Sequence, residues 1–117
     1  KVIENPEITK IAWNAKFDLQ IFEKYKIYLR GTLIDGMLAK YVLNEERPNG
    51  LKDMVQRYLP WAANYESDKD FDRIPWDKKP LKPLCQYGCQ DTDYTFRLSI
   101  FFEKVLIDKI YIICTVI

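Results

Sequence analysis

One helical stripe in the second half of this chain constrains its fold more than any other feature. Apolar and aromatic side chains recur at steps of three and four residues from Leu84 to Val105, which is the spacing of one helix face. Asp91 interrupts the middle of that stripe, and a carboxylate there is costly unless it is paired, neutralised or bound to metal. The pattern therefore predicts a long helix that carries one partnered acid. The stripe consists of Leu84, Tyr87, Asp91, Tyr94, Leu98, Phe101 and Val105.

Small residues run in a row beside this stripe and predict that a neighbouring element approaches closely. Two cysteines on the same segment, Cys85 and Cys89, are four residues apart, but no second Cys/His pair accompanies them. We therefore expect the two thiols to be buried as small apolar groups. The row consists of Gly88, Thr92, Thr95 and Ser99.

A second feature is the junction near the N-terminus, where a short apolar run ends at Trp13 and a helical pattern begins. Asn14 is a residue type that caps helices, because its side chain accepts a hydrogen bond from the first turn. Asp18 then lies in the first or second turn, just beyond the carboxyl end of a strand. Ligand sites in open α/β sheets form at that edge.

The remaining patterns complete an α/β order. Helical spacing continues from Ala15 to Lys26, and a second short strand is predicted to end at Asp35. Asp35 is either the N-cap of the next helix or a supporting residue near a site, and the sequence leaves both open. Residues 51–59 match the helical template throughout. Residues 60–83 lack a sustained period and are expected to form a long surface excursion.

Composition bounds the chemistry. The 117 residues suffice for one domain, and 48% hydrophobic and 15% aromatic content favours a packed fold. A net charge of +1 neither requires nor excludes nucleic acid. Because the chain has no histidine, a hydrolytic site must rest on carboxylates, tyrosine, lysine or thiols. Three cysteines and no signal peptide favour a reduced compartment, and the apolar segment 105–117 is shorter than the ~20 residues that cross a bilayer.

Tyr87 and Asp91 are four residues apart, so a helix points both side chains the same way. A carboxylate can hold a divalent cation while a neighbouring phenol orients an attacking water or hydroxide, which suits phosphodiester hydrolysis. The pair alone is a weak motif, and its weight comes from the segments that accompany it.

Read together, these segments resemble the 3′-5′ exonuclease domain of family A DNA polymerases, within the DEDD (DnaQ-like) exonuclease superfamily. The resemblance covers nearly the whole chain, in the family's order. The segments are Asn14–Asp18, Leu33–Ala39 with Tyr41–Asn44, Leu51–Asp53 with Tyr58–Leu59, and Tyr87–Asp91.

The resemblance implies a ribonuclease H-like α/β fold and removal of 3′-terminal nucleotides with two Mg²⁺ or Mn²⁺ ions. Asp18 is similar to the second-motif aspartate, which acts around the more loosely held ion. Asp91 is similar to the third-motif aspartate that ligates the tighter ion, and Tyr87 to the tyrosine of the DEDDy subclass. Asn14 and Phe17 match positions that lie against the terminal nucleotide, where stacking and polar contacts hold a frayed strand.

The chain departs from the family in lacking the first motif, an Asp-x-Glu on the opening strand. Two divalent ions bring +4 while Asp18 and Asp91 bring −2, which leaves strong repulsion between ions roughly 3.5–4 Å apart. We therefore expect a partial domain, without the first strands of the sheet and with an incomplete catalytic centre. Residues 105–117 are expected to lead towards a polymerase domain of the same parent chain.

The implied partners are a single-stranded 3′ end of DNA and that polymerase domain, with no membrane. The parent protein is expected to act inside the cell, in the cytoplasm or nucleoid, or as a virus-encoded enzyme in a host cell. Two alternatives stay open: an RNase D-like 3′-5′ exoribonuclease, which shares the same acids and tyrosine, and a catalytically incomplete module that only binds strands or packs against a polymerase.

Overall fold

The computed structural model describes residues 1–62 and 69–116, and residues 63–68 of the predicted excursion lie outside the described residues. The described chain is mostly helical and contains a two-stranded sheet. Its elements are β1 (Lys10–Ala12), α1 (Ala15–Lys24), β2 (Leu33–Asp35), α2 (Gly36–Leu43), α3 (Leu51–Tyr58), η1 (Pro60–Ala62), α4 (Lys69–Arg73), η2 (Trp76–Lys78) and α5 (Leu81–Val116).

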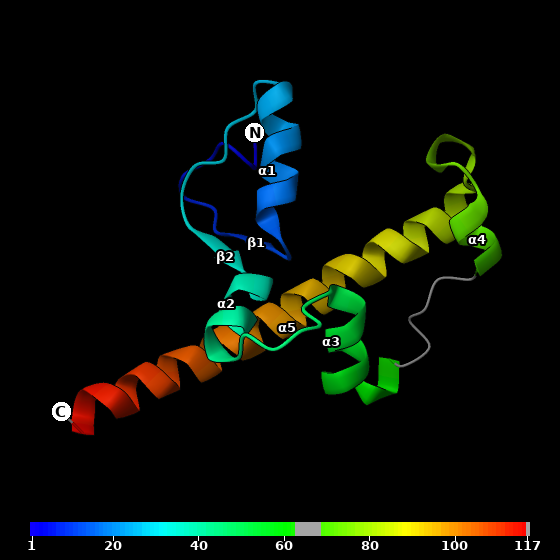
Figure 1. Ribbon diagram of the computed structural model, residues 1–117. Coiled ribbons are helices and arrows are strands. Elements are labelled where there is room, and N and C mark those ends of the chain that lie inside the picture. Colours follow the sequence, from blue (N-terminus) through cyan, green and yellow to red (C-terminus); the bar gives the residue numbers. More distant parts are fainter. Residues whose placement is uncertain (63–68, 117) are drawn as a thin grey trace.

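Helix α5 is the axis of the molecule (Figure 1). Its 36 residues correspond to about 54 Å of helix, close to the longest dimension of 56 Å. The radius of gyration is 16.4 Å, whereas a compact domain of this length has about 13 Å. The predicted long helix is confirmed and extends beyond its expected stripe at both ends.

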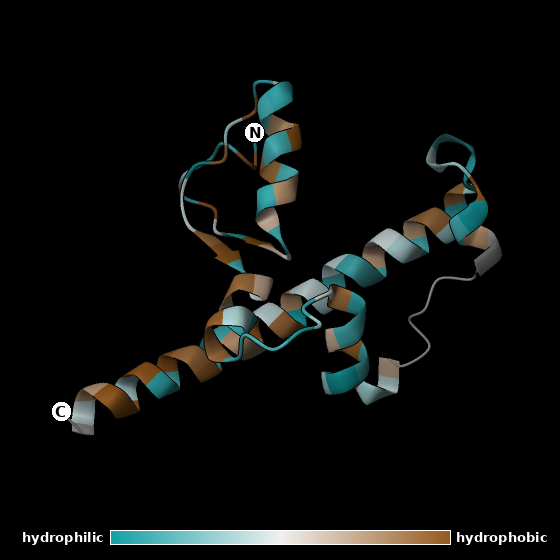
Figure 2. Ribbon diagram, viewed as in Figure 1, coloured by the Kyte–Doolittle hydropathy of each residue, from teal (hydrophilic) through white to brown (hydrophobic). Residues whose placement is uncertain are grey.

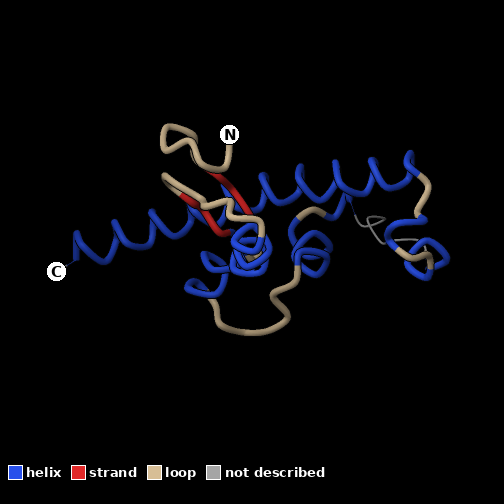
Figure 3. The backbone as a smooth tube through the Cα atoms, turned by 90° about the horizontal axis from the view of Figure 1, so that it is seen from above, coloured by secondary structure: helices blue, strands red, loops and turns tan. Residues whose placement is uncertain are grey.

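The two strands are parallel, with Lys10 paired to Leu33 and Ala12 paired to Asp35. This register ends both strands at one edge, so the starts of α1 and α2 lie side by side there. Both strands contact the middle of α5 (Figure 3). The apolar run before Trp13 suits a strand covered on both faces, but β1 is short and Ile11 and Ala12 are only half-buried.

The core lies where α3 packs against α5. Met54 and Val55 are almost completely buried against Leu98 and Phe102. Phe101, which the stripe predicted to be inside, is 46% exposed, while its neighbour Phe102 is 3% exposed. An α-helix drifts by about 20° per heptad relative to a 3.5-residue repeat, so the buried line moves off the stripe along α5.

The close approach predicted for the small residues occurs at Ser99 but not at Gly88. A methyl group on Gly36 would lie 2.3 Å from Ser99 Oγ and 2.7 Å from Trp13 Cε3, so the start of α2 sits directly on α5. A methyl group on Gly88 would meet nothing within 4 Å. The expected burial of the cysteines is also wrong: Cys85 and Cys89 are exposed, because no described element packs over that face of the helix.

Large apolar side chains remain exposed on several elements, among them α1 and the C-terminal part of α5. Phe17 and Ile21 on α1, and Tyr25 directly after it, are exposed although their helical spacing predicts an apolar packing face. The C-terminal part of α5 is rich in hydrophobic residues (Figure 2), and several of them are exposed. Within the described residues, no helix has the length and hydropathy needed to cross a bilayer. The exposed residues of that part of α5 are Ile107, Ile110, Tyr111, Ile112 and Ile113.

Candidate functional site

Asp35 joins the starts of two helices. Its Oδ1 accepts hydrogen bonds from the N–H groups of Met37 at 3.0 Å and Leu38 at 3.3 Å, which makes it the N-cap of α2. The same carboxylate accepts from the N–H groups of Asn14 at 3.1 Å and Ala15 at 2.8 Å. The two alternatives for Asp35 are therefore compatible, because one side chain caps α2 and holds the beginning of α1.

Asn14 does not cap α1 in the predicted way. It occupies the N-cap position with φ 60° and ψ 53°, in the left-handed region that asparagine tolerates, and its side chain makes no capping hydrogen bond. Asp35 supplies the missing acceptor from another strand. The direction of α1, and with it the position of Asp18, thus depends on a contact between residues 21 positions apart.

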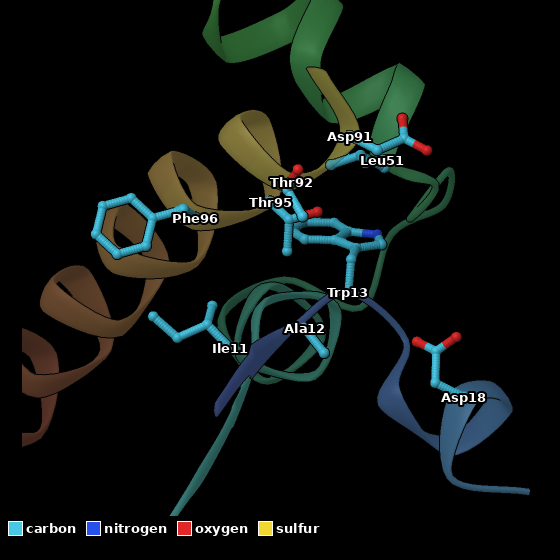
Figure 4. A pocket seen from close by; sticks show the side chains of 9 residues that line it. All are labelled: Ile11, Ala12, Trp13, Asp18, Leu51, Asp91, Thr92, Thr95 and Phe96. Atoms are coloured by element: carbon cyan, nitrogen blue, oxygen red, sulfur yellow. The ribbon is translucent and has the colours of Figure 1, made fainter. Parts of the chain in front are cut away.

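A cleft of about 560 Å³ opens between the β1–α1 junction and α5, and both predicted metal-binding acids line it. Asp18 enters from α1 and Asp91 from α5, with the Trp13 side chain beside them (Figure 4). The fold therefore brings together two carboxylates from opposite ends of the sequence. The complete lining is Ile11, Ala12, Trp13, Asp18, Leu51, Asp91, Thr92, Thr95 and Phe96.

Asp91 is the more enclosed of the two acids. It is half-buried, and its Oδ1 is buried without a hydrogen-bond partner. Burial raises the pKa of the Asp91 carboxyl above its usual range, and the positive charge of Lys52 opposes that shift in part. A desolvated carboxylate oxygen without a hydrogen-bond partner, on a residue that lines a cleft, is a group that a bound cation would stabilise.

Asp18 is exposed in the first turn of α1, at the positive end of the helix. It also lines a second, largely apolar cavity of about 330 Å³ between β1 and α1. A ligand at Asp18 would therefore be held more loosely than one at Asp91, because water reaches this carboxylate freely.

Tyr87 lies one turn before Asp91 on α5 but is not among the residues that line the cleft. Its ring packs against Phe71 and Trp76, with centroids 6.1 Å away in each case. Lys52 Nζ lies 5.9 Å from the centre of the same ring. The described part of the 60–83 excursion thus contacts the tyrosine through α4 and η2.

Asn14 and Phe17 lie beside the cleft rather than in its lining. Asn14 is exposed at the β1–α1 junction, and Phe17 is 62% exposed. Phe17 faces a separate shallow depression along α1 that Gln20 and Lys24 also line. The structure therefore brings Asp18 and Asp91 together and leaves the two predicted nucleotide contacts at the rim.

The comparison with known proteins agrees with this arrangement. A family model described as 3′-5′ exonuclease matches residues 1–107. The chain belongs to this 3′-5′ exonuclease family. The predicted resemblance to the exonuclease domains of DNA polymerases is thereby confirmed.

Relatives of this exonuclease chain include polymerases and a ribonuclease. It is 38% identical over 109 residues to DNA polymerase I of Synechocystis sp., covering 91% of this chain and 11% of the relative. It is 29% identical to the DNA polymerase of Escherichia phage T5, covering 87% of this chain and 14% of the relative. It is 31% identical to ribonuclease D of Haemophilus influenzae, covering 90% and 26%. The chain thus spans between 11% and 26% of these relatives, and no solved structure matches it.

Three residues in or near the cleft received no functional assignment from sequence. Trp13 lines the cleft and is fixed by a 3.0 Å hydrogen bond from its Nε1 to the Asn49 carbonyl oxygen. Thr95 lines the cleft from α5, and Lys52 acts on both Asp91 and Tyr87. The sequence signal for Lys52 was its place in the Leu51–Asp53 segment.

The donor set fits part of a metal site. Carboxylate oxygens suit Mg²⁺ and Mn²⁺, and Asp91 Oδ1 has no other partner. Within the described residues, however, no group of three or more His, Cys, Asp or Glu side chains is placed to hold an ion. Asp18 and Asp91 would therefore supply only part of the ligand set that a divalent cation needs.

Proposed function

We propose that this chain is part of a metal-dependent 3′-5′ exonuclease domain that hydrolyses 3′-terminal nucleotides of DNA and proofreads for a family A DNA polymerase. The observation that carries the proposal is the shared cleft, whose lining includes both Asp18 and Asp91, together with the buried Asp91 oxygen that has no hydrogen-bond partner. Membership of the exonuclease family and the match to polymerases support it.

In this proposal Asp91 and Asp18 hold two Mg²⁺ or Mn²⁺ ions, Asp91 more tightly because it is the more enclosed. Two bound ions supply neutralisation of developing charge and a more acidic water. Tyr87 orients the attacking water through its hydroxyl, and its packing against Phe71 and Trp76 holds the ring in place. Asp35 supports the site by fixing the start of α1.

The substrate is a single-stranded 3′ end. Phe17 offers an exposed ring at the rim of the cleft, on which an unpaired base can stack whatever its sequence. Asn14 offers an amide next to it, whose side chain makes no capping bond. The site would therefore select frayed ends, because an unpaired base is free to stack on Phe17, whereas a paired base is already stacked in its duplex.

We also propose that the fold is ribonuclease H-like and is completed by strands outside these 117 residues. A two-stranded parallel sheet with half-buried side chains is not stable alone. The charge balance needs at least one further carboxylate pair, which the same strands would supply.

A polymerase domain in the same protein would explain the exposed apolar end of α5. In this proposal residues 105–117 connect towards a polymerase domain of the same protein, which would cover the exposed isoleucines on that part of the helix. The protein would then act inside a cell, where its DNA substrate is.

A second candidate is an RNase D-like exoribonuclease, favoured by the 31% identity to ribonuclease D. RNA and DNA differ in the 2′-OH of the sugar, and the residue types that line the cleft do not by themselves indicate which sugar is preferred. The two candidates share the acids and the tyrosine, so only the sugar of the substrate separates them.

The deciding experiment uses the full-length protein and matched, 3′-labelled DNA and RNA oligonucleotides. We expect Mg²⁺-dependent release of single nucleotides from DNA, faster from a mispaired than from a paired terminus, and no release with EDTA. Faster release from RNA would favour the exoribonuclease. No release from either substrate, with Mg²⁺ and Mn²⁺ both tried, would leave a module that only binds strands and would contradict the proposal.

A further inference from the structure

Lys52 lies where it influences both proposed catalytic side chains. It is half-buried in the first turn of α3, and its Nζ is 5.9 Å from the centre of the Tyr87 ring. Its positive charge also acts on Asp91, one turn further along α5. The ammonium group thus lies beside the Tyr87 ring, and Asp91 follows Tyr87 by one turn on the same helix.

The position of Lys52 is well fixed by its helix. Met54 and Val55, two and three residues later, are among the most buried side chains and pack against α5. Leu51, immediately before it, lines the cleft. Because α3 is held on both sides of Lys52, the backbone of this residue cannot move away from α5 without disturbing the core.

We propose that Lys52 is a positioning residue of the exonuclease site, which holds the Tyr87 ring by a cation–π contact and neutralises Asp91 until a divalent cation binds. This inference rests on the proposed function. The face of an aromatic ring attracts an ammonium group, which restrains the phenol in one orientation. The same charge offsets the cost of keeping an enclosed carboxylate without a metal ion.

This role has two consequences of opposite sign. An arriving divalent cation is repelled by the ammonium group that already faces Asp91, so Lys52 weakens metal binding. The same group keeps Tyr87 ordered for the reaction, so Lys52 raises turnover once metal is bound. A lysine with a purely structural role would change both quantities in the unfavourable direction when it is removed.

The test uses the full-length protein with Lys52→Met, Lys52→Gln and Lys52→Arg. Two quantities are measured: the dissociation constant for Mn²⁺ without substrate, by electron paramagnetic resonance of free Mn²⁺, and kcat for nucleotide release at saturating metal. Lys104→Met is the matched control, because Lys104 is an exposed lysine on α5 and its loss removes the same charge. Melting curves verify that each variant is folded.

For Lys52→Met and Lys52→Gln we expect Mn²⁺ to bind roughly three- to tenfold more tightly and kcat to fall by about tenfold or more. Lys52→Arg keeps the charge and should stay within about threefold of the wild type in both quantities. Unchanged or weaker Mn²⁺ binding in the neutral variants, or values equal to those of Lys104→Met, would overturn the inference. A wild-type protein that neither binds Mn²⁺ nor releases nucleotides would instead overturn the proposed function, and the inference with it.

Discussion

Asp18 and Asp91 line the same cleft although β2, α2, α3 and the 60–83 excursion separate them in the chain. Two structural features place them there. The carboxylate of Asp35 holds the start of α1, and α5 carries Asp91 past that point as one continuous helix. Each of these features leads to testable predictions.

Asp35→Ala should destabilise the domain by about 2–4 kcal/mol, because the starts of two helices each lose a capping acceptor worth about 1–2 kcal/mol. Exonuclease activity should fall as well, since α1 then loses the contact that directs Asp18. Urea denaturation of the full-length protein, followed through the transition of this domain, measures the first effect. Asp108→Asn, which replaces an exposed acid within α5 away from any helix start, is the control and should change stability by less than about 0.5 kcal/mol.

Gly36→Ala and Gly88→Ala should have opposite effects. A methyl group on Gly36 meets Ser99 Oγ at 2.3 Å and the Trp13 ring at 2.7 Å, and overpacking of this kind costs about 1–3 kcal/mol. Gly88 is on α5 with open space around it, so alanine should stabilise the helix by up to about 1 kcal/mol. Thermal melts of the two variants check this pair. Equal effects would show that α2 does not rest on α5 at Ser99.

Asp91→Asn should abolish nearly all activity. It should nevertheless stabilise the folded protein at neutral pH, relative to the wild type. Burial raises the pKa of the Asp91 carboxyl in the folded state. A raised folded-state pKa favours the protonated acid. The contribution of Asp91 to folding stability is therefore complete below the unfolded-state pKa and is lost as pH rises through the folded-state pKa. The melting temperature of Asp91→Asn relative to the wild type should therefore be higher at pH 7 than at pH 3, when both are measured without metal.

Added Mg²⁺ supplies the control for that experiment. A cation that binds the folded site stabilises it by mass action, so Mg²⁺ should raise the melting temperature of the wild type at pH 7 and leave Asp91→Asn almost unchanged. An equal rise in the melting temperature of both proteins with Mg²⁺ would show that Asp91 does not bind the ion.

The isolated 117-residue chain should associate in solution. The α1 face with Phe17 and Ile21, together with the last turns of α5, leaves large apolar areas exposed, and such patches mark interaction surfaces or aggregation. Sedimentation velocity and binding of a hydrophobic dye measure this. A monomer that melts cooperatively and binds no dye would show that these faces need no covering.

Local patterns predicted the elements and the two acids because helical spacing and strand ends are local properties. The stripe around Asp91 fixed the course of α5, and the junction at Trp13 placed Asp18 near its observed turn. The cap of α1 could not be predicted in this way, because its acceptor belongs to Asp35 on another strand. The exposure of Cys85 and Phe17 was also beyond reach, because burial depends on which neighbouring element covers a face.

The role of Tyr87 marks the same limit within the site. Spacing placed it one turn from Asp91, but its contacts with Phe71 and Trp76 come from a segment without periodicity. Only the folded chain shows that this segment packs on the tyrosine.

The most direct test of the account is a double-mutant cycle between Asp18→Asn and Asp91→Asn in the full-length protein. Mg²⁺-dependent nucleotide release from single-stranded DNA is measured for the wild type, both single variants and the double variant. If the two carboxylates serve one site, each single substitution should lower kcat by about a thousandfold or more, and the double variant should be little worse than either. Effects that multiply, or a single variant that retains the wild-type rate, would contradict a shared site in this cleft.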